Sequence, residues 1–433
     1  MPRSLRITLG ADTRGFEPEV SHVLGALRVA HGIEWRDCPA GDARGDAWLH
    51  YGCDPPAGAI HMPAILFPAA ARIEDDGIHL DRARLDTVAR GLVPTADPRA
   101  FDAIGLCFLL MTRLEERDHA GGDRYGRYPF EADFMRVNGL YGGVPVDEAL
   151  LALARLATGE DEPASATRYR VVATHDVDRL RAYHRPTEPL RLAAGDILRR
   201  RDPMRALERL AAYGSREPWP SVRDIMEMSE RHGIRSRFFF MGPSEDSHDS
   251  PYGLTMAGLL RRVAGEILAR GHAVGFHPGF GSATDAALWD RQRRGLEQVL
   301  GQTVREGRQH MLLWRADATP DIWHDAGMSL DLTLAYPEAE GFRTGSCRAL
   351  PAYSLRRRKT LSHLQASTPV MEFGQFGGKY RDRDVDDALQ GSRGVIASCR
   401  RHGGDLVMLF HTGQRHGPAR AFHEAMLAEA CGR

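Results

Sequence analysis

Lysine is nearly absent from this chain, and so are long apolar runs and any excess of one charge. Only two of the 433 residues are lysine, so arginine carries almost all of the positive charge. The formal net charge is −1, which gives no reason to expect a nucleic acid or an anionic membrane surface as partner. No run of about 18 apolar residues is present, so we expect no membrane-spanning helix.

Cysteine is also sparse, and its spacing excludes the common metal and disulfide frameworks. The six cysteines are scattered, with no C-x-x-C pair and no zinc-finger spacing, which is typical of reduced, buried thiols. The first residues, MPRSLRITLGADTRGF, lack the apolar segment of a secretory signal. These absences predict a cytoplasmic protein. Its oligomeric state is left open.

The pattern of the chain changes near residue 165. Residues 1–160 combine a short strand pattern at 5–10 with helical spacing at 19–32 and 102–117, which predicts a small α/β domain. The polar segment 158–168 carries a proline and no periodicity, which is typical of a linker. No phosphate-binding glycine motif assigns a role to this N-terminal domain.

Residues 166–433 alternate between strand and helix patterns. Such alternation predicts parallel βα units, and about seven units in this length suit a closed or nearly closed barrel. Helical spacing is found at 221–233, 255–271 and 287–301. The expected strands are 169–178, 236–242, 272–280, 305–314, 330–338, 370–376 and 405–413.

Residues 179–220 interrupt this rhythm directly after the first of these strands. The segment is arginine-rich and helical in pattern. Connections of this length in βα units are usually functional. A lid that faces the substrate and an insertion that only packs on the body are both compatible with the sequence.

Acidic and imidazole side chains recur where the expected strands end. Asp176 and Asp178 are two residues apart, so in extended chain they face the same way. His277, His310 and His411 lie at or near the ends of three other strands. Because the carboxyl ends of barrel strands form the active site, we expect these five residues at one rim. Alternatively, each histidine is a hydrogen-bonded structural residue and the aspartates cap a helix.

These residue types suit metal-assisted hydrolysis. One aspartate and two histidines can hold a divalent ion and leave a position open for water and substrate. A second carboxylate beside that position can act as a general base, and a further histidine can protonate the leaving group. His272 stands at the start of its strand, away from the rim, so we assign it a structural role.

Three motifs carry a resemblance to a known family. THDVD at 174–178, GHAVGFHPG at 271–279 and LFH at 409–411 resemble the motifs of the polysaccharide deacetylase superfamily, that of carbohydrate esterase family four. The nearer resemblance is to a bacterial branch with a T-x-D-V-D first motif and an additional N-terminal region. It implies a distorted (β/α)7 barrel at 166–433, preceded by a smaller α/β domain.

The resemblance also implies roles for individual residues. Asp176 matches the general base of the family and Asp178 its metal-binding aspartate. His277 matches the first metal-binding histidine and His411 the general acid. Gly281 stands where the family has its second metal-binding histidine. We therefore expect His310 as the third ligand, with His248 as the alternative.

Three further residues are candidates for contacts with the substrate. Arg343 lies between glycines in GFRTGSC and could pair with a carboxylate or phosphate, although a surface loop would explain it equally well. Tyr336 could face the site from the preceding strand end. Arg308 is the third candidate, and either it or Arg315 matches the arginine that orients the base in the family.

Together these observations predict a metal-dependent hydrolase. The expected reaction removes an acetyl or similar acyl group from an N-acylated sugar or saccharide precursor, with one divalent ion. Zinc is the expected metal, and cobalt and nickel are the alternatives. The same site could serve an amidohydrolase acting on a non-sugar amide. A barrel that has lost catalysis and only binds saccharide is the third reading, because Gly281 replaces a ligand.

Overall fold

The computed structural model describes residues 4–37, 47–95, 97–181, 187–214, 221–376, 378–413 and 417–432. Its centre is a nine-stranded sheet in the order β12-β13-β11-β10-β9-β8-β7-β15-β14. The strands are β7 (Arg170–Val177), β8 (Arg237–Phe240), β9 (Ala273–Phe276), β10 (Glu306–Gly307), β11 (Leu330–Leu334), β12 (Leu350–Ser354), β13 (Lys359–Ser367), β14 (Val370–Met371) and β15 (Asp405–Leu409).

The neighbours in this sheet are parallel, except that β12 runs antiparallel to β13. All seven strands expected from the sequence are present, although β10 and β14 have two residues each. The β12–β13 hairpin was not expected. Its first strand is short and contains Pro351, which weakens the strand signal.

The expected closed (β/α)7 barrel is not shown. Within the described ranges no pairing joins β14 to the opposite end of the sheet. The hairpin gives a physical reason: β13 pairs with β11 on one side and with β12 on the other, so its second edge is already occupied. The fold is therefore α/β with a parallel sheet that is open in its hydrogen bonding.

Helices connect the parallel strands. The long ones show the expected boundary chemistry: Asp285 caps α13 by accepting a hydrogen bond from the backbone N–H of Leu288 (2.9 Å), and Gly301 ends it with φ of 72°. The helices are α10 (Ser221–Arg231), α11 (Tyr252–Thr255), α12 (Ala257–Ala269), α13 (Ala286–Leu300), α14 (Thr319–Asp325), α15 (Val385–His402) and α16 (Pro418–Ala430).

The N-terminal residues form a second, smaller α/β arrangement. A parallel sheet in the order β2-β1-β3-β4 is accompanied by the antiparallel pair β5-β6. Its strands are β1 (Ser4–Leu9), β2 (Glu34–Asp37), β3 (Ala47–Tyr51), β4 (Ile60–Met62), β5 (Ala71–Glu74) and β6 (Gly77–Leu80). Its helices are α1 (Glu17–His31), α2 (Leu66–Ala69), α3 (Arg82–Val88), α4 (Ala103–Thr112), α5 (Leu114–Arg117), α6 (Phe134–Val137) and α7 (Pro145–Thr158).

This N-terminal part shares a hydrophobic core with the edge of the large sheet. Buried residues of α1 and α4 form one cluster with Leu350, Tyr353 and Leu355 of the β12–β13 hairpin. Phe108 and Tyr353 make an edge-to-face contact with ring centroids 5.1 Å apart. The hairpin that the sequence did not reveal is thus the surface on which the N-terminal part packs. A domain boundary near residue 165 stays a prediction.

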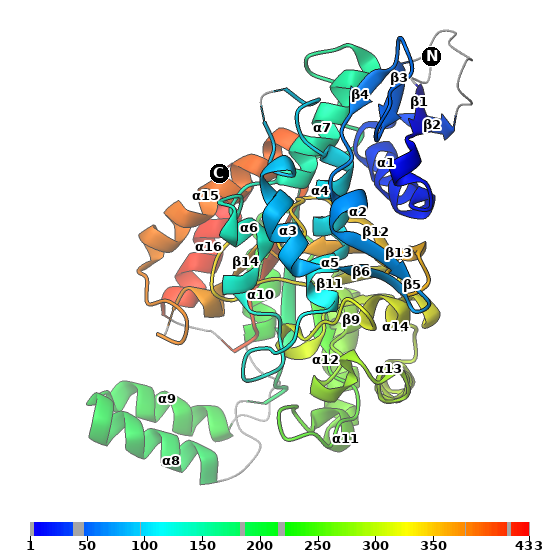
Figure 1. Cartoon of the computed structure of the whole chain (residues 1–433). Coiled ribbons are helices and arrows are strands. Elements are labelled where there is room, and N and C mark those ends of the chain that lie inside the picture. The colour runs from blue at the N-terminus through cyan, green and yellow to red at the C-terminus, as the bar shows by residue number, and fades with distance from the viewer. Residues whose placement is uncertain are drawn as a thin grey trace.

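The arginine-rich insertion is helical, as expected. It comprises α8 (Thr187–Gly195), a π-helical turn at Asp196–Arg200, and α9 (Pro203–Gly214). The two helices lie side by side and stand out from the rest of the molecule in Figure 1. Residues 182–186 and 215–220 of the insertion lie outside the described residues. None of the helices in the described part of the chain is long and apolar enough to cross a bilayer.

Candidate metal and acid–base site

The carboxyl end of β7 places both aspartates beside one histidine. Asp176 is the last but one residue of β7 and is buried, while Asp178 follows the strand with a side chain 35% exposed. Their carboxylate oxygens lie 3.9 Å and 3.5 Å from Nε2 of His277. The two side chains therefore face the same point, as their spacing in the sequence predicts.

Three predicted ligands come together here. The ligand atoms of Asp178, His277 and His310 all lie within 4.8 Å of one another. The rings of His277 and His310 are 5.1 Å apart at an angle of 65°. Gly281, where the resemblance in the sequence would have placed a second metal-binding histidine, lies in a 3-10 turn. His310, from the neighbouring strand end, supplies the second imidazole instead.

The hydrogen bonds of His277 and His310 determine which ring nitrogen of each is free to bind a metal. Nδ1–H of His277 donates to the carbonyl oxygen of Arg308 (2.5 Å), and Nδ1–H of His310 donates to Oδ1 of Asp249 (2.6 Å). A carbonyl and a carboxylate can only accept, so the proton of each neutral ring is on Nδ1. Both Nε2 lone pairs are then available to a metal, because the acceptor on each Nδ1–H holds the ring in that orientation.

The residues present fit a divalent ion. Oδ1 of Asp178 and Nε2 of His277 are buried and have no hydrogen-bond partner, although orphaned buried polar atoms are rare. Burial opposes a charge on His277, yet Asp176 and Asp178 raise its pKa. The carboxylates therefore favour positive charge at this point. One carboxylate oxygen and two imidazole nitrogens form a donor set that suits zinc.

Arg308 holds Asp176 rather than facing open space. It is fully buried and donates from Nη1 to Oδ1 of Asp176 (2.8 Å) and from Nε to the carbonyl oxygen of Leu332 (3.0 Å). Burial raises the pKa of Asp176, but Arg308, together with His277 and His411, lowers it by more, so the pKa is lowered overall. This contradicts the substrate contact expected for Arg308 and agrees with its alternative role of orienting the base.

His411 follows β15 and is held by a carboxylate on its other side. Its Nδ1–H and its backbone N–H both donate to Oε1 of Glu372, at 2.8 Å and 2.7 Å. Burial opposes its charge, but Glu372 raises the pKa of His411 to about 9. Nε2 points to the site, 3.9 Å from Oδ2 of Asp178. At neutral pH this imidazole is a proton donor.

The turn after His310 is strained. Met311 and Leu312 both adopt left-handed backbone conformations, with φ of 59° and 57°. Non-glycine residues in this region cost about 1–2 kcal/mol each and persist where the surroundings require them. Here the strain accompanies the placement of a predicted ligand.

Arg343 and Tyr336 lie in a buried network, not at an open substrate surface. Arg343 is 2% exposed, pairs with Glu116 (2.7 Å) and stacks on the Tyr336 ring (4.6 Å). The hydroxyl of Tyr336 donates to Asp133 (2.9 Å), which also pairs with Arg113 (2.6 Å). Their expected substrate contacts are therefore not shown. The partners that satisfy them come from the N-terminal part, which the sequence could not indicate.

The other two histidines considered lie outside the group. His248 pairs with Asp246 (2.9 Å) and stacks on Phe280 (4.1 Å). His272 accepts the backbone N–H of Ser236 (2.9 Å) and contacts Glu230, which is the structural role expected for it.

Sequence reasoning missed the two carboxylates that hold the imidazoles. Asp249 directly follows His248, the alternative ligand, and its carboxylate also accepts a hydrogen bond from the hydroxyl of Ser244 (2.6 Å). Glu372 opens a 3-10 turn after β14. For Glu372 a signal was available, since it is an acidic residue inside the expected strand 370–376. Asp249 lies seven residues beyond the expected strand 236–242, and no local pattern marks it.

Two other polar groupings do not form a comparable site. The ligand atoms of Glu74, Asp76 and His79 also converge, but the two ring nitrogens of His79 are hydrogen-bonded to Asp76 and Asp118.

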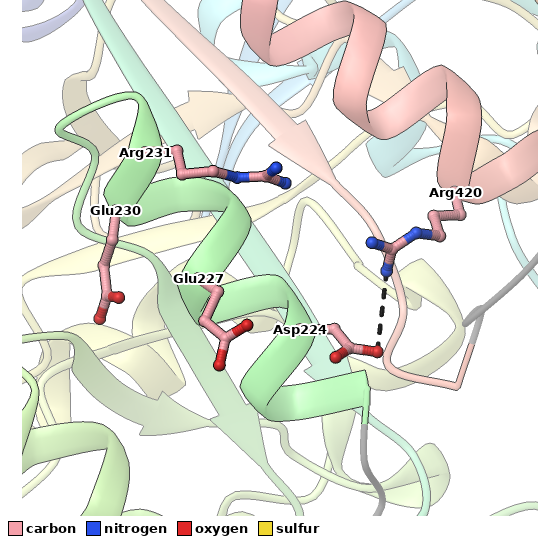
Figure 2. A pocket seen from close by; sticks show the side chains of 5 residues that line it. All are labelled: Asp224, Glu227, Glu230, Arg231 and Arg420. Atoms are coloured by element: carbon pink, nitrogen blue, oxygen red, sulfur yellow. Dashed lines mark ion pairs between the residues drawn. The ribbon is translucent and has the colours of Figure 1, made fainter.

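A surface hollow of about 600 Å³ on α10 and α16 is lined by acidic and arginine side chains, with Asp224 paired to Arg420 at 3.7 Å (Figure 2). None of the predicted site residues lines this hollow, so the candidate active site is the group formed by Asp178, His277 and His310. Its lining is Asp224, Glu227, Glu230, Arg231 and Arg420.

Comparison with known proteins finds only distant likenesses. No family model and no curated protein matches the chain. A candidate polysaccharide deacetylase from Mycobacterium smegmatis aligns with 18% identity and a TM-score of 0.39, over 60% of this chain and 83% of its own. A family 4 carbohydrate esterase from Streptomyces lividans, solved in complex with acetate, aligns with 12% identity and a TM-score of 0.32. The alignment covers 62% of this chain and 91% of the esterase. A CE4 family pseudoenzyme from Bacillus anthracis aligns with 14% identity and a TM-score of 0.32. The alignment covers 61% of this chain and 60% of the pseudoenzyme. TM-scores this low carry no argument about function, which rests on the geometry of the site.

Proposed function

We propose that this protein is a metal-dependent hydrolase that removes an acyl group, with acetyl the expected one, from an N-acylated saccharide or saccharide precursor. The convergence of Asp178, His277 and His310, flanked by Asp176 and His411, carries the proposal. Asp178 and the two Nε2 atoms would hold one divalent ion, with zinc expected. Such an ion supplies Lewis acidity toward water and the acyl oxygen.

The residues of the chain divide the proton transfers between them. Asp176 is ionised because Arg308 pairs with it, and it accepts the proton of the attacking water. His411 is protonated because Glu372 faces it, and it donates to the nitrogen that leaves. An amide requires this donation, since an amide anion is a very poor leaving group. A carboxylate base and an imidazolium acid beside one ligand group suit C–N hydrolysis and are not needed by a module that only binds saccharide.

The test separates the two aspartates by metal content and acetate release. Wild-type protein should bind one equivalent of zinc and release acetate from N-acetylated saccharides. Asp178→Asn should lose most of the metal, whereas Asp176→Asn should keep it and lose activity by at least about 100-fold. A wild-type protein that binds no zinc, cobalt or nickel would contradict the proposal. The proposal includes a cytoplasmic location, which cell fractionation followed by detection of the protein would test.

A further inference from the structure

One basic and aromatic cluster adjoins the site without a role in the chemistry above. It consists of Arg124, Tyr125, Arg127, Lys379 and Tyr380, and we call it the Tyr125 cluster.

Three cations surround the ring of Tyr125. The guanidinium carbons of Arg124 and Arg127 lie 4.6 Å and 5.3 Å from the ring centroid, and Nζ of Lys379 lies 5.6 Å from it. Nζ of Lys379 is also 5.1 Å from the ring of Tyr380. Cation–π contacts offset part of the repulsion between like charges, but they do not neutralise it. Lys379 is one of only two lysines in the chain.

Among the described residues, one carboxylate pairs with these cations. Asp123 pairs with Arg127 (2.6 Å) and also accepts the backbone N–H groups of Tyr125 and Arg127. Three cations against one carboxylate leave a formal charge of +2. Arg124 and Lys379 are exposed, so their charged ends are accessible.

The cluster is tied to the site on two sides. Nη1 of Arg127 donates to the carbonyl oxygen of Met311 (3.4 Å), the residue that follows the ligand His310. Nη2 of Arg127 donates to the hydroxyl of Tyr380 (3.2 Å). Lys379 and Tyr380 follow closely on the turn that carries Glu372, the partner of His411.

An exposed aromatic ring lies beside His411. Phe373 is 40% exposed, and its ring lies against that of His411 with centroids 4.2 Å apart and a tilt of 31°. Burying such an apolar face is favourable when a sugar ring covers it. The rim therefore offers an apolar platform beside the acid and a cationic cluster beside the metal ligands.

We propose that the Tyr125 cluster binds a phosphate of the substrate, so that the acyl group removed lies on a phosphorylated saccharide. A phosphate dianion matches the charge of +2, and guanidinium, ammonium and phenolic hydroxyl groups are all donors to phosphate oxygens. The inference rests on the proposed function for the reaction and adds the substrate class. It also gives the N-terminal part a role, since three of the five residues belong to it.

Calorimetric titration of a matched pair of ligands tests this. The pair is an N-acetylhexosamine and the same sugar carrying a phosphate monoester. Wild-type, zinc-loaded protein should bind the phosphorylated sugar at least about tenfold more tightly. Arg124→Gln/Lys379→Gln should lose that preference. Arg127 is left intact because its partly buried ion pair with Asp123 holds the loop together.

The control variant is Arg262→Gln/Arg291→Gln, which makes the same change in net charge at exposed positions of α12 and α13. It should keep the preference. Equal binding of the two sugars by wild type, or a preference that survives in the cluster variant, would overturn the inference. Tighter binding of the matching uronate than of the phosphate would overturn the assignment to phosphate.

Acetate release from the neutral sugar keeps the two proposals separate. If the neutral sugar is deacetylated equally by wild type and the cluster variant, and phosphate brings no gain in binding, the proposed function stands and this inference fails. If the cluster-dependent binding of phosphate is seen without acetate release from either sugar, the binding site stands and the proposed reaction fails.

Discussion

Two imidazoles of the proposed site are oriented by a carboxylate on Nδ1. His310 depends on Asp249 at 2.6 Å, and His411 depends on Glu372 at 2.8 Å. The first contact frees Nε2 as a ligand and the second keeps the ring protonated. The same residue type therefore serves two functions, and the neighbouring carboxylate decides which one.

Asp249→Asn should weaken metal binding. The amide no longer holds Nδ1–H of His310 as a carboxylate does, so the orientation and basicity of the ligand both fall. We expect zinc affinity to drop about 10–100-fold, measured by competition with a chelator. Asp246→Asn, which changes the partner of His248, is the matched control and should retain wild-type affinity. Equal losses in both variants would show that Asp249 has no specific role.

Glu372→Gln should move the alkaline limit of activity to lower pH. His411 acts in its protonated form, so activity is lost as pH rises through its pKa, which is about 9 with Glu372 ionised beside it. Without that charge, only Asp178 and Asp176 still raise the pKa against burial, and the fall in kcat/KM should shift by about one pH unit or more. Glu424→Gln on α16 is the control. An unchanged pH profile would exclude His411 as the acid.

At the scale of elements, the site depends on how closely β9 and β10 approach. His277 follows β9, while Arg308 and His310 follow β10, and the two strands meet at the pair Phe276 and Gly307. A Cβ on Gly307 would lie 1.9 Å from the carbonyl oxygen of Phe276. Glycine is therefore required here for close approach of two backbones, not for an unusual φ.

Gly307→Ala should separate these strands. We expect a loss of about 2 kcal/mol or more in the free energy of unfolding, from urea titration, together with weaker zinc binding. Gly265→Ala on α12 is the control, because a Cβ there meets nothing within 4 Å. That change should stabilise the protein by about 0.5–1 kcal/mol, as alanine favours helix. A Gly307 variant as stable as wild type would contradict the close approach.

At the scale of the whole molecule, the N-terminal part is joined to the large sheet by charge as well as by apolar packing. Glu116 and Asp133 face Arg343 and Tyr336 across this junction, and all four are buried. Removing one partner of a buried ion pair leaves the other uncompensated, which costs more than the pair contributes.

Arg343→Met should therefore act on stability and not on substrate binding. We expect the free energy of unfolding to fall by about 2 kcal/mol or more, since Oε2 of Glu116 loses its guanidinium while Oε1 keeps its pair with Arg113 (2.7 Å). KM of the folded variant should stay at the wild-type value. Arg393→Met, which removes an exposed pair with Glu429, should leave the unfolding midpoint unchanged. A raised KM with unchanged stability would restore the substrate contact expected from the sequence.

The sequence alone determined the local features of this protein. Alternation of strand and helix patterns predicted an α/β fold and all seven expected strands. The two-residue spacing of Asp176 and Asp178 predicted that they face one point, and the strand ends predicted which histidines join them. These features follow from short-range periodicity and from the rule that parallel strands end at one edge, so they can be read along the chain.

Only the tertiary structure decided which partners meet across long separations. Asp249 reaches His310 across 61 residues, and Arg343 meets Glu116 across 227. The same holds for the β12–β13 hairpin, whose second strand uses the edge that a closed barrel would need. A side chain at an expected strand end is compatible with an open cleft or a buried ion pair. The choice depends on which distant segment packs against it, and no local pattern in the chain records that.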